Sequence, residues 1–148
     1  MVYQQRITKT ELARNTHRAI REAQRGYAVV VENHGQAEVA IVDILDFRLQ
    51  RAAIQYFAAP AKYDEDIKIT EELLESLPDE QDRCNLVIGH YLAMNVSLAR
   101  AAEFLGMHSA ELQMRLARAG VPLHLGPRTL DEARSEIETA RRFEKKGR

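Results

Sequence analysis

The chain has 148 residues, of which 45% are hydrophobic and 29% charged, with a formal net charge of −1. This length fits one domain of ordinary size or two small ones, and the composition is typical of a packed protein with a charged surface. The sequence contains no run of 18 apolar residues and no apolar leader. A membrane span and a secretion signal are therefore not expected, and the cytoplasm is the predicted location.

The near-neutral total conceals an uneven distribution of charge. Nine acidic residues and two lysines fall between Lys62 and Asp82, whereas residues 141–148 hold five basic residues and one Glu. Because nucleic-acid binding depends on local basic surfaces, the net charge does not exclude it. The single Cys84 excludes an intrachain disulfide and, within an apolar helical pattern, is expected to be a buried thiol.

Residues 1–57 are expected to form a strand, a helix, two strands and a second helix. The strands are predicted over three short runs with β-branched residues: Val2–Ile7, Tyr27–Glu32 and Ala37–Val42. The loop Asn33–Gln36 predicts a hairpin, because Asn and Gly tolerate positive φ. Asp43 is expected to cap the second helix.

A basic helix is predicted over Lys9–Arg25. Its apolar side holds Leu12, Thr16, Ala19, Ile20 and Ala23. The opposite side holds guanidinium groups at spacings of 4, 3 and 4 residues: Arg14, Arg18, Arg21 and Arg25. With little acidic compensation nearby, this row is either a solvated helix face or a surface that meets an anion such as a DNA phosphate.

The same part of the chain carries an ordered pattern of apolar, polar and glycine positions. Its members are Ile7-Thr8, Glu11-Leu12, Arg14-Asn15, Ile20, Gly26, Val29–Val31, Asn33-His34-Gly35, Val39–Val42 and Phe47. The pattern resembles the N-terminal domain of the Phd/YefM antitoxins. That resemblance implies a dimer that places the basic helix on operator DNA. The candidate DNA contacts here are Lys9, Arg14, Arg18, Arg21 and Arg25.

A homodimer through residues 1–57 is expected from the apolar surface as well. One helix on a three-stranded sheet covers too little apolar surface for a unit of this size. The surplus apolar positions are Val29, Val31, Val39, Ile41 and Phe47.

Residues 58–66, with Pro60 and an acidic cluster, are interpreted as a linker. The remaining residues, 67–148, predict a mostly helical unit. It begins with a short strand at Ile67–Ile69 and contains four helices capped by Thr70, Asp79, Ser97 and Ser109. A short edge strand at Val121–Leu125 and a last helix opened by a capping box at Thr129 complete the prediction.

The helices after Ser97 and Ser109 form a helix-turn-helix signature, joined through Gly106 with Ala102 four residues earlier. The outward face of the second of these helices is expected to present Glu111, Met114, Arg115 and Arg118. Arg115 and Arg118 are therefore further candidate DNA contacts. Short helix pairs of this kind also occur in plain helical bundles, so packing or partner binding is the alternative.

A second ordered pattern runs through this half of the chain. Its members are Ile67-x-Ile69, Leu73-Leu74, Tyr91-Leu92, Ser97-Leu98, Ala101-Ala102, Leu105-Gly106-Met107 and Gly120-Val121-Pro122-Leu123. From Ile67 to about Arg142 the chain resembles a small uncharacterised prokaryotic helix-turn-helix family regarded as antitoxin-like. Members of that family tend to be encoded beside PIN-domain nucleases.

The last helix, from Thr129 to Arg148, joins an apolar stripe to a cationic end. Its candidate toxin-binding residues are Leu130, Ile137, Arg141, Arg142 and Phe143. Such a helix fits a groove on a partner, and an Arg can pair with the metal-binding carboxylates of a nuclease. The alternative is that the stripe packs on its own domain and the tail is a solvated end.

No residue pattern points to catalysis. The five histidines are scattered, without the His–Cys or His–carboxylate spacing of a zinc site, and no phosphate-binding glycine loop or nucleophile elbow is present. We therefore expect no enzyme, no catalytic residue, no metal and no cofactor.

Together these features predict an α+β protein: a β-α-β-β-α dimerisation domain (1–57), a linker (58–66) and a helix-turn-helix domain (67–148). The function favoured is an antitoxin of a type II toxin-antitoxin system that represses its own operon as a DNA-binding homodimer. Its partner toxin is expected to be a PIN-domain nuclease, with Fic-type and RelE-type toxins as other possibilities. The alternatives are a stand-alone repressor and an interaction module that does not bind DNA.

Overall fold

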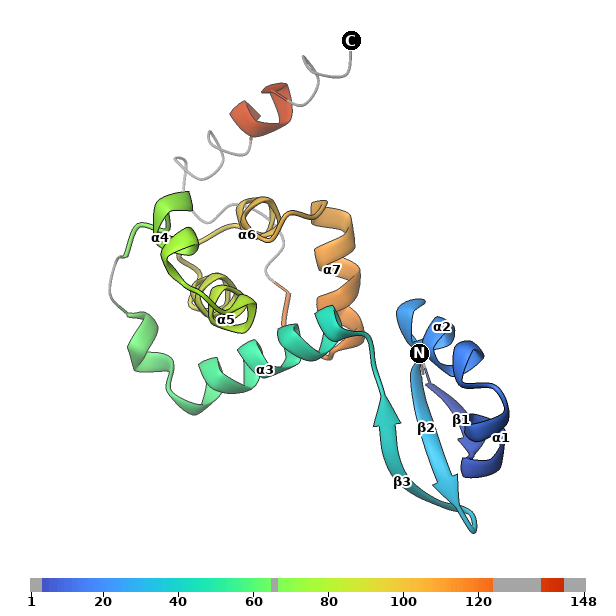
Figure 1. The fold of residues 1–148 in the computed structure, drawn as a ribbon. Helices are drawn as coiled ribbons and strands as arrows, with labels where there is room; N and C mark the ends of the chain where they lie inside the picture. Colours follow the sequence, from blue (N-terminus) through green and yellow to red (C-terminus); the bar gives the residue numbers. More distant parts are fainter. Residues whose placement is uncertain (1–3, 65–66, 124–136, 143–148) are drawn as a thin grey trace.

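The computed structural model describes residues 4–64, 67–123 and 137–142 (Figure 1). Residues 4–42 form a small mixed sheet covered on one side by two short helices, which we call the sheet body. Residues 43–123 form a larger, all-helical unit, which we call the helical body. This arrangement confirms the predicted α+β class, with a sheet at the N-terminal end followed by a mostly helical part.

The sheet body contains three strands in the order β1-β2-β3, in which β1 is parallel and β3 antiparallel to β2. The parallel pair requires a crossover, and the two helices between β1 and β2 supply it. The elements are β1 (Gln4–Thr8), α1 (Lys9–Arg14), α2 (Thr16–Gln24), β2 (Ala28–Asn33) and β3 (Gln36–Ile41).

The prediction of one continuous helix over Lys9–Arg25 is wrong, because the chain forms two helices separated at Asn15. The Asn15 side chain accepts a hydrogen bond from the backbone N–H of Arg18 at 3.2 Å and so caps α2. Asn favours this capping position over a helix interior, since its side chain competes for backbone hydrogen bonds. The break tilts α1 relative to α2 without removing either helix from the face of the sheet (Figure 1).

The hairpin between β2 and β3 is a two-residue turn, as expected. His34 and Gly35 both have positive φ, 51° and 78°, which a type I′ turn requires. Gly35 meets that requirement without cost, whereas His34 adopts a conformation that few residues with a Cβ favour.

The core of the sheet body is small. It consists of Ala19, Ala23 and Val29, with Ile7, Leu12 and Ile41 packed at its edge. Alternation along the strands places Val30 and its register partners Arg6 and Ala40 on the opposite face of the sheet. Within the described residues no helix of the sheet body covers that face (Figure 1).

The helical body is built around α3 (Ile44–Ala58) and α5 (Glu80–Leu92), which pack closely along their lengths. Leu49, Ala52 and Ala53 of α3 belong to the same buried cluster as Tyr91, Leu112 and Leu116. Thus α3, which the sequence pattern groups with residues 1–57, contributes its buried side to the helical core. The other elements are η1 (Pro60–Tyr63), α4 (Glu71–Ser76), α6 (Leu98–Phe104) and α7 (Ser109–Arg118).

The helix caps follow the sequence prediction except in one case. The side chains of Asp43, Thr70, Asp79 and Ser97 each accept a backbone N–H of the helix that follows. Ser109 is the first residue of α7, and the capping position is held by His108, whose side chain makes no capping hydrogen bond.

The two short strands predicted for this half are wrong where the structure describes them. Residues 67–70 and 121–123 are neither helix nor strand. Residues 124 and 125, and the predicted capping box at Thr129, lie outside the described residues.

The segment interpreted as a linker contacts the helical body through η1. Tyr63 is buried, and its ring lies against Gly89 of α5 so closely that a Cβ there would come within 2.0 Å of it. The amide nitrogen of Asn95 donates to the Tyr63 carbonyl oxygen at 2.9 Å. These contacts hold residues 60–63 against α5.

Candidate functional site

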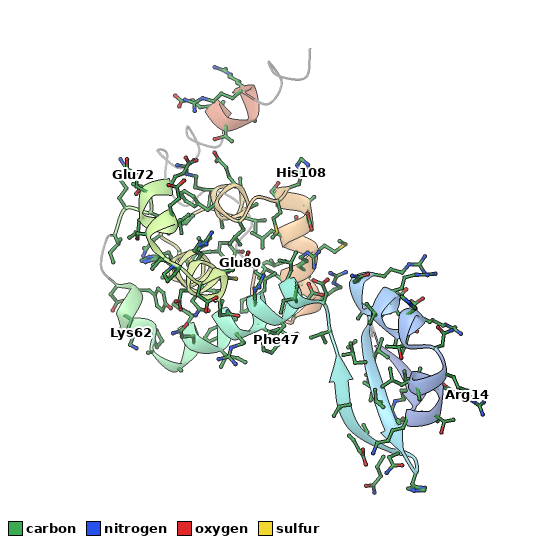
Figure 2. The ribbon with its side chains drawn as sticks, in the orientation of Figure 1. Arg14, Phe47, Lys62, Glu72, Glu80 and His108 are labelled. Carbon is green, nitrogen blue, oxygen red and sulfur yellow. The ribbon has the colours of Figure 1, made fainter. Side chains whose placement is uncertain are left out.

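The arginine row predicted on the basic helix is exposed on the outer surface of α1 and α2. Arg14 ends α1, Arg18 and Arg21 belong to α2, and Arg25 is the C-terminal cap residue of α2. Figure 2 shows Arg14 pointing away from the helical body. Among the described residues, no acidic side chain forms an ion pair with Arg14, Arg18 or Arg21, and we call these three the arginine ladder.

The other two N-terminal candidates are paired. Arg25 Nη1 lies 3.5 Å from Glu22 Oε1, and Lys9 Nζ lies 2.6 Å from Glu38 Oε2. The hydrogen bonds from Lys9 and Asn33 lower the pKa of the Glu38 carboxyl. Lys9 and Arg25 therefore carry less uncompensated charge than the ladder.

The ladder lies beside a groove next to the unpaired edge of β1. Arg14 and Arg18 line this groove of about 310 Å³, and the carboxylate residues Glu11 and Glu22 line it as well. The first turn of α2 contains no acidic residue, so the positive end of its helix dipole is uncompensated there. Unpaired guanidinium groups beside such a helix end attract anions, phosphate groups in particular.

The two arginines of α7 have a different environment, and their predicted outward placement is wrong. Arg115 Nη1 lies 2.8 Å from Asp46 Oδ1 and 3.1 Å from Asp43 Oδ1, while its Nε donates to Glu111 at 3.1 Å. Arg118 Nη2 lies 3.3 Å from Asp46 Oδ2. The side chains of these two arginines are 13% and 11% exposed, so both point into the molecule.

The physical reason lies in the packing of α7. Leu112 and Leu116 are fully buried, and this fixes the side of α7 that faces α3. Arg115 and Arg118 flank that side and meet the first turn of α3, where Asp43 and Asp46 stand. Burial alone would lower the pKa of Arg115, but hydrogen bonds to Asp46 and Glu111 and the nearby carboxylates outweigh it and raise that pKa.

We call Asp43, Asp46, Arg115 and Arg118 the charge cluster. With Glu111 it combines two positive and three negative groups, and so it offers no surplus positive charge to a DNA phosphate. Sequence spacing does not predict these ion pairs, because Asp46 and Asp43 lie 69 and 72 residues from Arg115. The one local signal is Arg115 itself, which stands where a helix-turn-helix usually has an aliphatic residue.

The predicted toxin-binding helix is described in part. Residues 137–142 are helical, and Ile137, Arg141 and Arg142 are exposed, whereas Leu130 and Phe143 lie outside the described residues. The side chain of Ile137 is 52% exposed. The neighbouring Thr139 and Ala140 line a cavity of about 230 Å³ with residues of α6 and the start of α7.

Four large apolar side chains of α3 are exposed: Ile44, Phe47, Ile54 and Phe57. The first three lie on the side of α3 opposite its buried side. Phe47, labelled in Figure 2, lies near the start of α3, and its ring is 5.6 Å from the Arg51 guanidinium carbon. We call this group the α3 stripe. Of the residues predicted to form a dimer seam, Phe47 and Val39 are exposed, while Val29 and Val31 are buried within the sheet body.

The described residues contain no group of three or more His, Cys, Asp or Glu side chains able to hold a metal ion. None of the described helices has the length and apolar character needed to cross a membrane. Cys84 is buried, and burial raises the pKa of its thiol to about 12, so it is not a reactive nucleophile at neutral pH.

The family model of an uncharacterised protein family (UPF0175) matches residues 64–142, slightly more than half of the chain. The matched segment runs from the end of η1 through α4–α7 to residues 137–142, and it coincides with the second of the two sequence resemblances. The match does not reach the sheet body. No curated protein and no solved structure matches the chain.

Proposed function

The chain belongs to the uncharacterised protein family UPF0175, and we propose that it is the antitoxin of a type II toxin-antitoxin system. In this proposal a homodimer binds operator DNA through the sheet body. It neutralises a partner toxin through its C-terminal segment, residues 129–148. It has no catalytic activity. The observation that carries the proposal is the arginine ladder, three exposed guanidinium groups without an ion-pair partner among the described residues.

The ladder supports DNA as the ligand because of its spacing and its surroundings. Arg14, Arg18 and Arg21 follow one another at four and three residues, across the capped start of α2. A duplex presents phosphates as a regular row, and each cation that meets one releases a counterion. The resemblance of residues 7–47 to Phd/YefM antitoxins points to the same use of this surface.

The α3 stripe and the uncovered sheet face support a homodimer. The side chains of Ile54 and Phe57 are 68% and 56% exposed. Neighbouring large apolar side chains in contact with water are typical of a surface that a partner covers. A second copy that covers both surfaces would complete a core that the sheet body lacks on its own. The dimer would also present two ladders, as a two-fold symmetric operator requires.

The C-terminal segment supports a toxin contact. Ile137 is exposed in the described helix, which is the exposure expected of an anchor for a partner groove. Arg141 and Arg142 follow it and are exposed too, so an acidic nuclease site fits this end of the chain. A PIN-domain nuclease is the toxin that we favour, because the resemblance of this half points to such neighbours.

An interaction module without an operator is the second candidate. It is favoured by the charge cluster, which leaves the helix-turn-helix pair without its two predicted DNA-contacting arginines. A stand-alone repressor shares the DNA contact of the main proposal and differs from it in lacking a toxin.

The DNA arm is tested with the region upstream of the gene as the probe. The triple variant Arg14→Ala, Arg18→Ala, Arg21→Ala should bind this DNA more weakly, and its salt dependence should flatten by about 0.9 in log–log slope for each phosphate that the protein no longer neutralises. A matched control removes three exposed or surface-paired cations of the helical body, with Lys62→Ala, Lys68→Ala and Arg100→Ala. An unchanged slope in the folded ladder variant contradicts DNA binding by the ladder.

The toxin arm is tested by co-expression with the product of the adjacent reading frame. Ile137→Asp should abolish co-purification and protection of cells, because it places a charge in an apolar contact. Glu138→Gln, next to it on the same helix, is the control. Full protection by the Ile137 variant rules out this helix as the neutralising element.

A further inference from the structure

The charge cluster lies at the junction between the sheet body and the helical body. The chain passes from the sheet body into the helical body at Val42–Asp43, and Asp43 caps α3 immediately afterwards. Among the described elements, no strand or helix of the sheet body packs extensively on a helix of the helical body. In Figure 1 the C-terminal end of α7 lies beside the start of α3, close to the sheet body. The orientation of the sheet body therefore depends on a few contacts around this junction.

Arg118 makes the most direct of these contacts. Its guanidinium group lies against Gly26, in the turn between α2 and β2, where a Cβ would come within 1.9 Å of Nη1. Gly26 has φ of 101°, which favours glycine, and a Cβ there would displace the Arg118 guanidinium. Arg118 is thus held by Asp46 on one side and touches the backbone of the sheet body on the other.

Arg115 secures the other half of the junction. It bonds both Asp43, the first residue after the sheet body, and Asp46, one turn into α3. The four side chains of the cluster are between 11% and 15% exposed. Buried ion pairs of this kind contribute geometry more reliably than stability, and removing one member leaves an uncompensated buried charge.

We propose that Asp43, Asp46, Arg115 and Arg118 form a clamp that fixes the orientation of the sheet body on the helical body. Resting on the proposed function, the clamp also sets the angle at which the arginine ladder meets DNA. Arg115 and Arg118 are then positioning residues and do not contact DNA, although they lie on the second helix of the helix-turn-helix pair.

A cavity adjoins the clamp. This cavity of about 200 Å³ lies between the bodies, lined by Gln4, Gly26, Tyr27 and Ala28 on one side and by Asp46, Gln50 and Arg118 on the other. Arg118 Nε is buried and has no hydrogen-bond partner among the described residues. Without the Asp46 carboxylate, the Arg118 guanidinium would lose its ion pair. Its N–H groups would then need water in the cavity as a hydrogen-bond partner.

The clamp is tested first without DNA. Spin labels at Gln36→Cys in β3 and Glu72→Cys in α4 report the distance between the bodies in the full-length chain. Cys84 stays in place, since its thiol is buried and its pKa of about 12 keeps it unlabelled. Labelled chains are diluted with unlabelled ones, so that each distance belongs to one protomer.

We expect one narrow distance distribution in the parent chain and a broadened or shifted one in Arg118→Ala and Asp46→Ala. Asp46→Asn, which keeps the size of the side chain and one acceptor, is a second and milder variant. Circular dichroism of each variant tests whether the chain is folded. The control is Arg100→Ala, which removes an exposed ion pair with Glu103 on α6 and should leave the distribution unchanged. Unchanged distributions in the folded cluster variants overturn the clamp.

DNA binding supplies the second measurement. Arg118→Ala should weaken binding of the upstream DNA by about tenfold, the scale of a typical coupling between sites, with the salt slope unchanged. A slope that falls by about 0.9 means that Arg118 itself neutralises a phosphate, and this overturns the positioning role. If the parent chain binds no DNA, the proposed function fails, while the distance measurement still decides whether the clamp exists.

Discussion

The sheet body and the helical body differ in how completely each fills its own core. The helical body buries Leu49, Ile88, Tyr91, Leu112 and Leu116 almost entirely, with contributions from α3, α5 and α7. The sheet body buries only small side chains, Ala19, Ala23 and three valines of β2, and none of its described helices covers the second face of the sheet. Since stability follows buried apolar area, we expect the helical body to be the more stable of the two.

The arginines of the two bodies differ in whether carboxylates of the protein pair with them. Arg115 and Arg118 of the helical body are satisfied by internal carboxylates, while Arg14, Arg18 and Arg21 of the sheet body lack such partners among the described residues. A charged surface group that the protein itself does not neutralise is available to a ligand. Under the proposed function, ligand binding therefore falls to the sheet body, and we expect the helical body to be the more stable support.

The largest expected effect concerns the helical core. Leu116 is 0% exposed, and Leu116→Ala should lower the free energy of unfolding by about 2 to 5 kcal/mol. Urea denaturation followed by circular dichroism measures the decrease. In the parent chain, hydrogen exchange should be slowest for the amides of α3, α5 and α7. Slower exchange in β1–β3 would mean that the sheet body is the more stable of the two. Met114→Ala, on the exposed side of the same helix, is the control.

The part of the fold that the sequence predicts is the part set by neighbours along the chain. The caps at Thr70, Asp79 and Ser97 and the turn at His34-Gly35 each depend on residues within four positions. Short-range hydrogen bonds and φ preferences decide such features, and sequence spacing records them directly.

The features that sequence reasoning placed wrongly depend on distant partners. In the sequence pattern Arg115 lies on the outward face of its helix. The packing of α3 on α7 brings Asp43 and Asp46 to it, and it is largely buried. Likewise, α3 has apolar residues on two sides, and its sequence does not say which side faces the helical core. In the folded protein Leu49, Ala52 and Ala53 pack into the helical core, and the α3 stripe is exposed.

A change at the α3 stripe should have the next largest effect. Phe47→Ala removes a large side chain from the expected dimer seam and should raise the dimer dissociation constant by about 30-fold, equal to about 2 kcal/mol. Sedimentation equilibrium of the full-length protein measures it. Met114→Ala, which removes an exposed apolar side chain of α7 outside the seam, should leave the constant unchanged. A parent chain that is monomeric at micromolar concentration contradicts the predicted dimer.

The smallest expected effect is a pH dependence confined to the helical body. His90 is 1% exposed, and burial lowers its pKa below the ordinary value of 6.5. The amide nitrogen of Asn95 lies 3.2 Å from His90 Nδ1 and 2.9 Å from the Tyr63 carbonyl oxygen, and it donates to both. Nδ1 must therefore accept, which the neutral ring with its proton on Nε2 does and the charged ring cannot.

Because the unfolded chain binds this proton more readily than the folded one, the contribution of His90 is complete above pH 6.5 and declines as the pH falls below it. The slope from one such group reaches at most about 1.4 kcal/mol per pH unit. Urea unfolding between about pH 7 and pH 5 should show a shallower pH dependence in His90→Phe, which keeps a ring but does not titrate. His17→Gln, on the exposed surface of α2, should leave the dependence unchanged. Equal slopes in the parent chain and His90→Phe would mean that folding does not lower the pKa of His90, and this would contradict a neutral ring that accepts from Asn95.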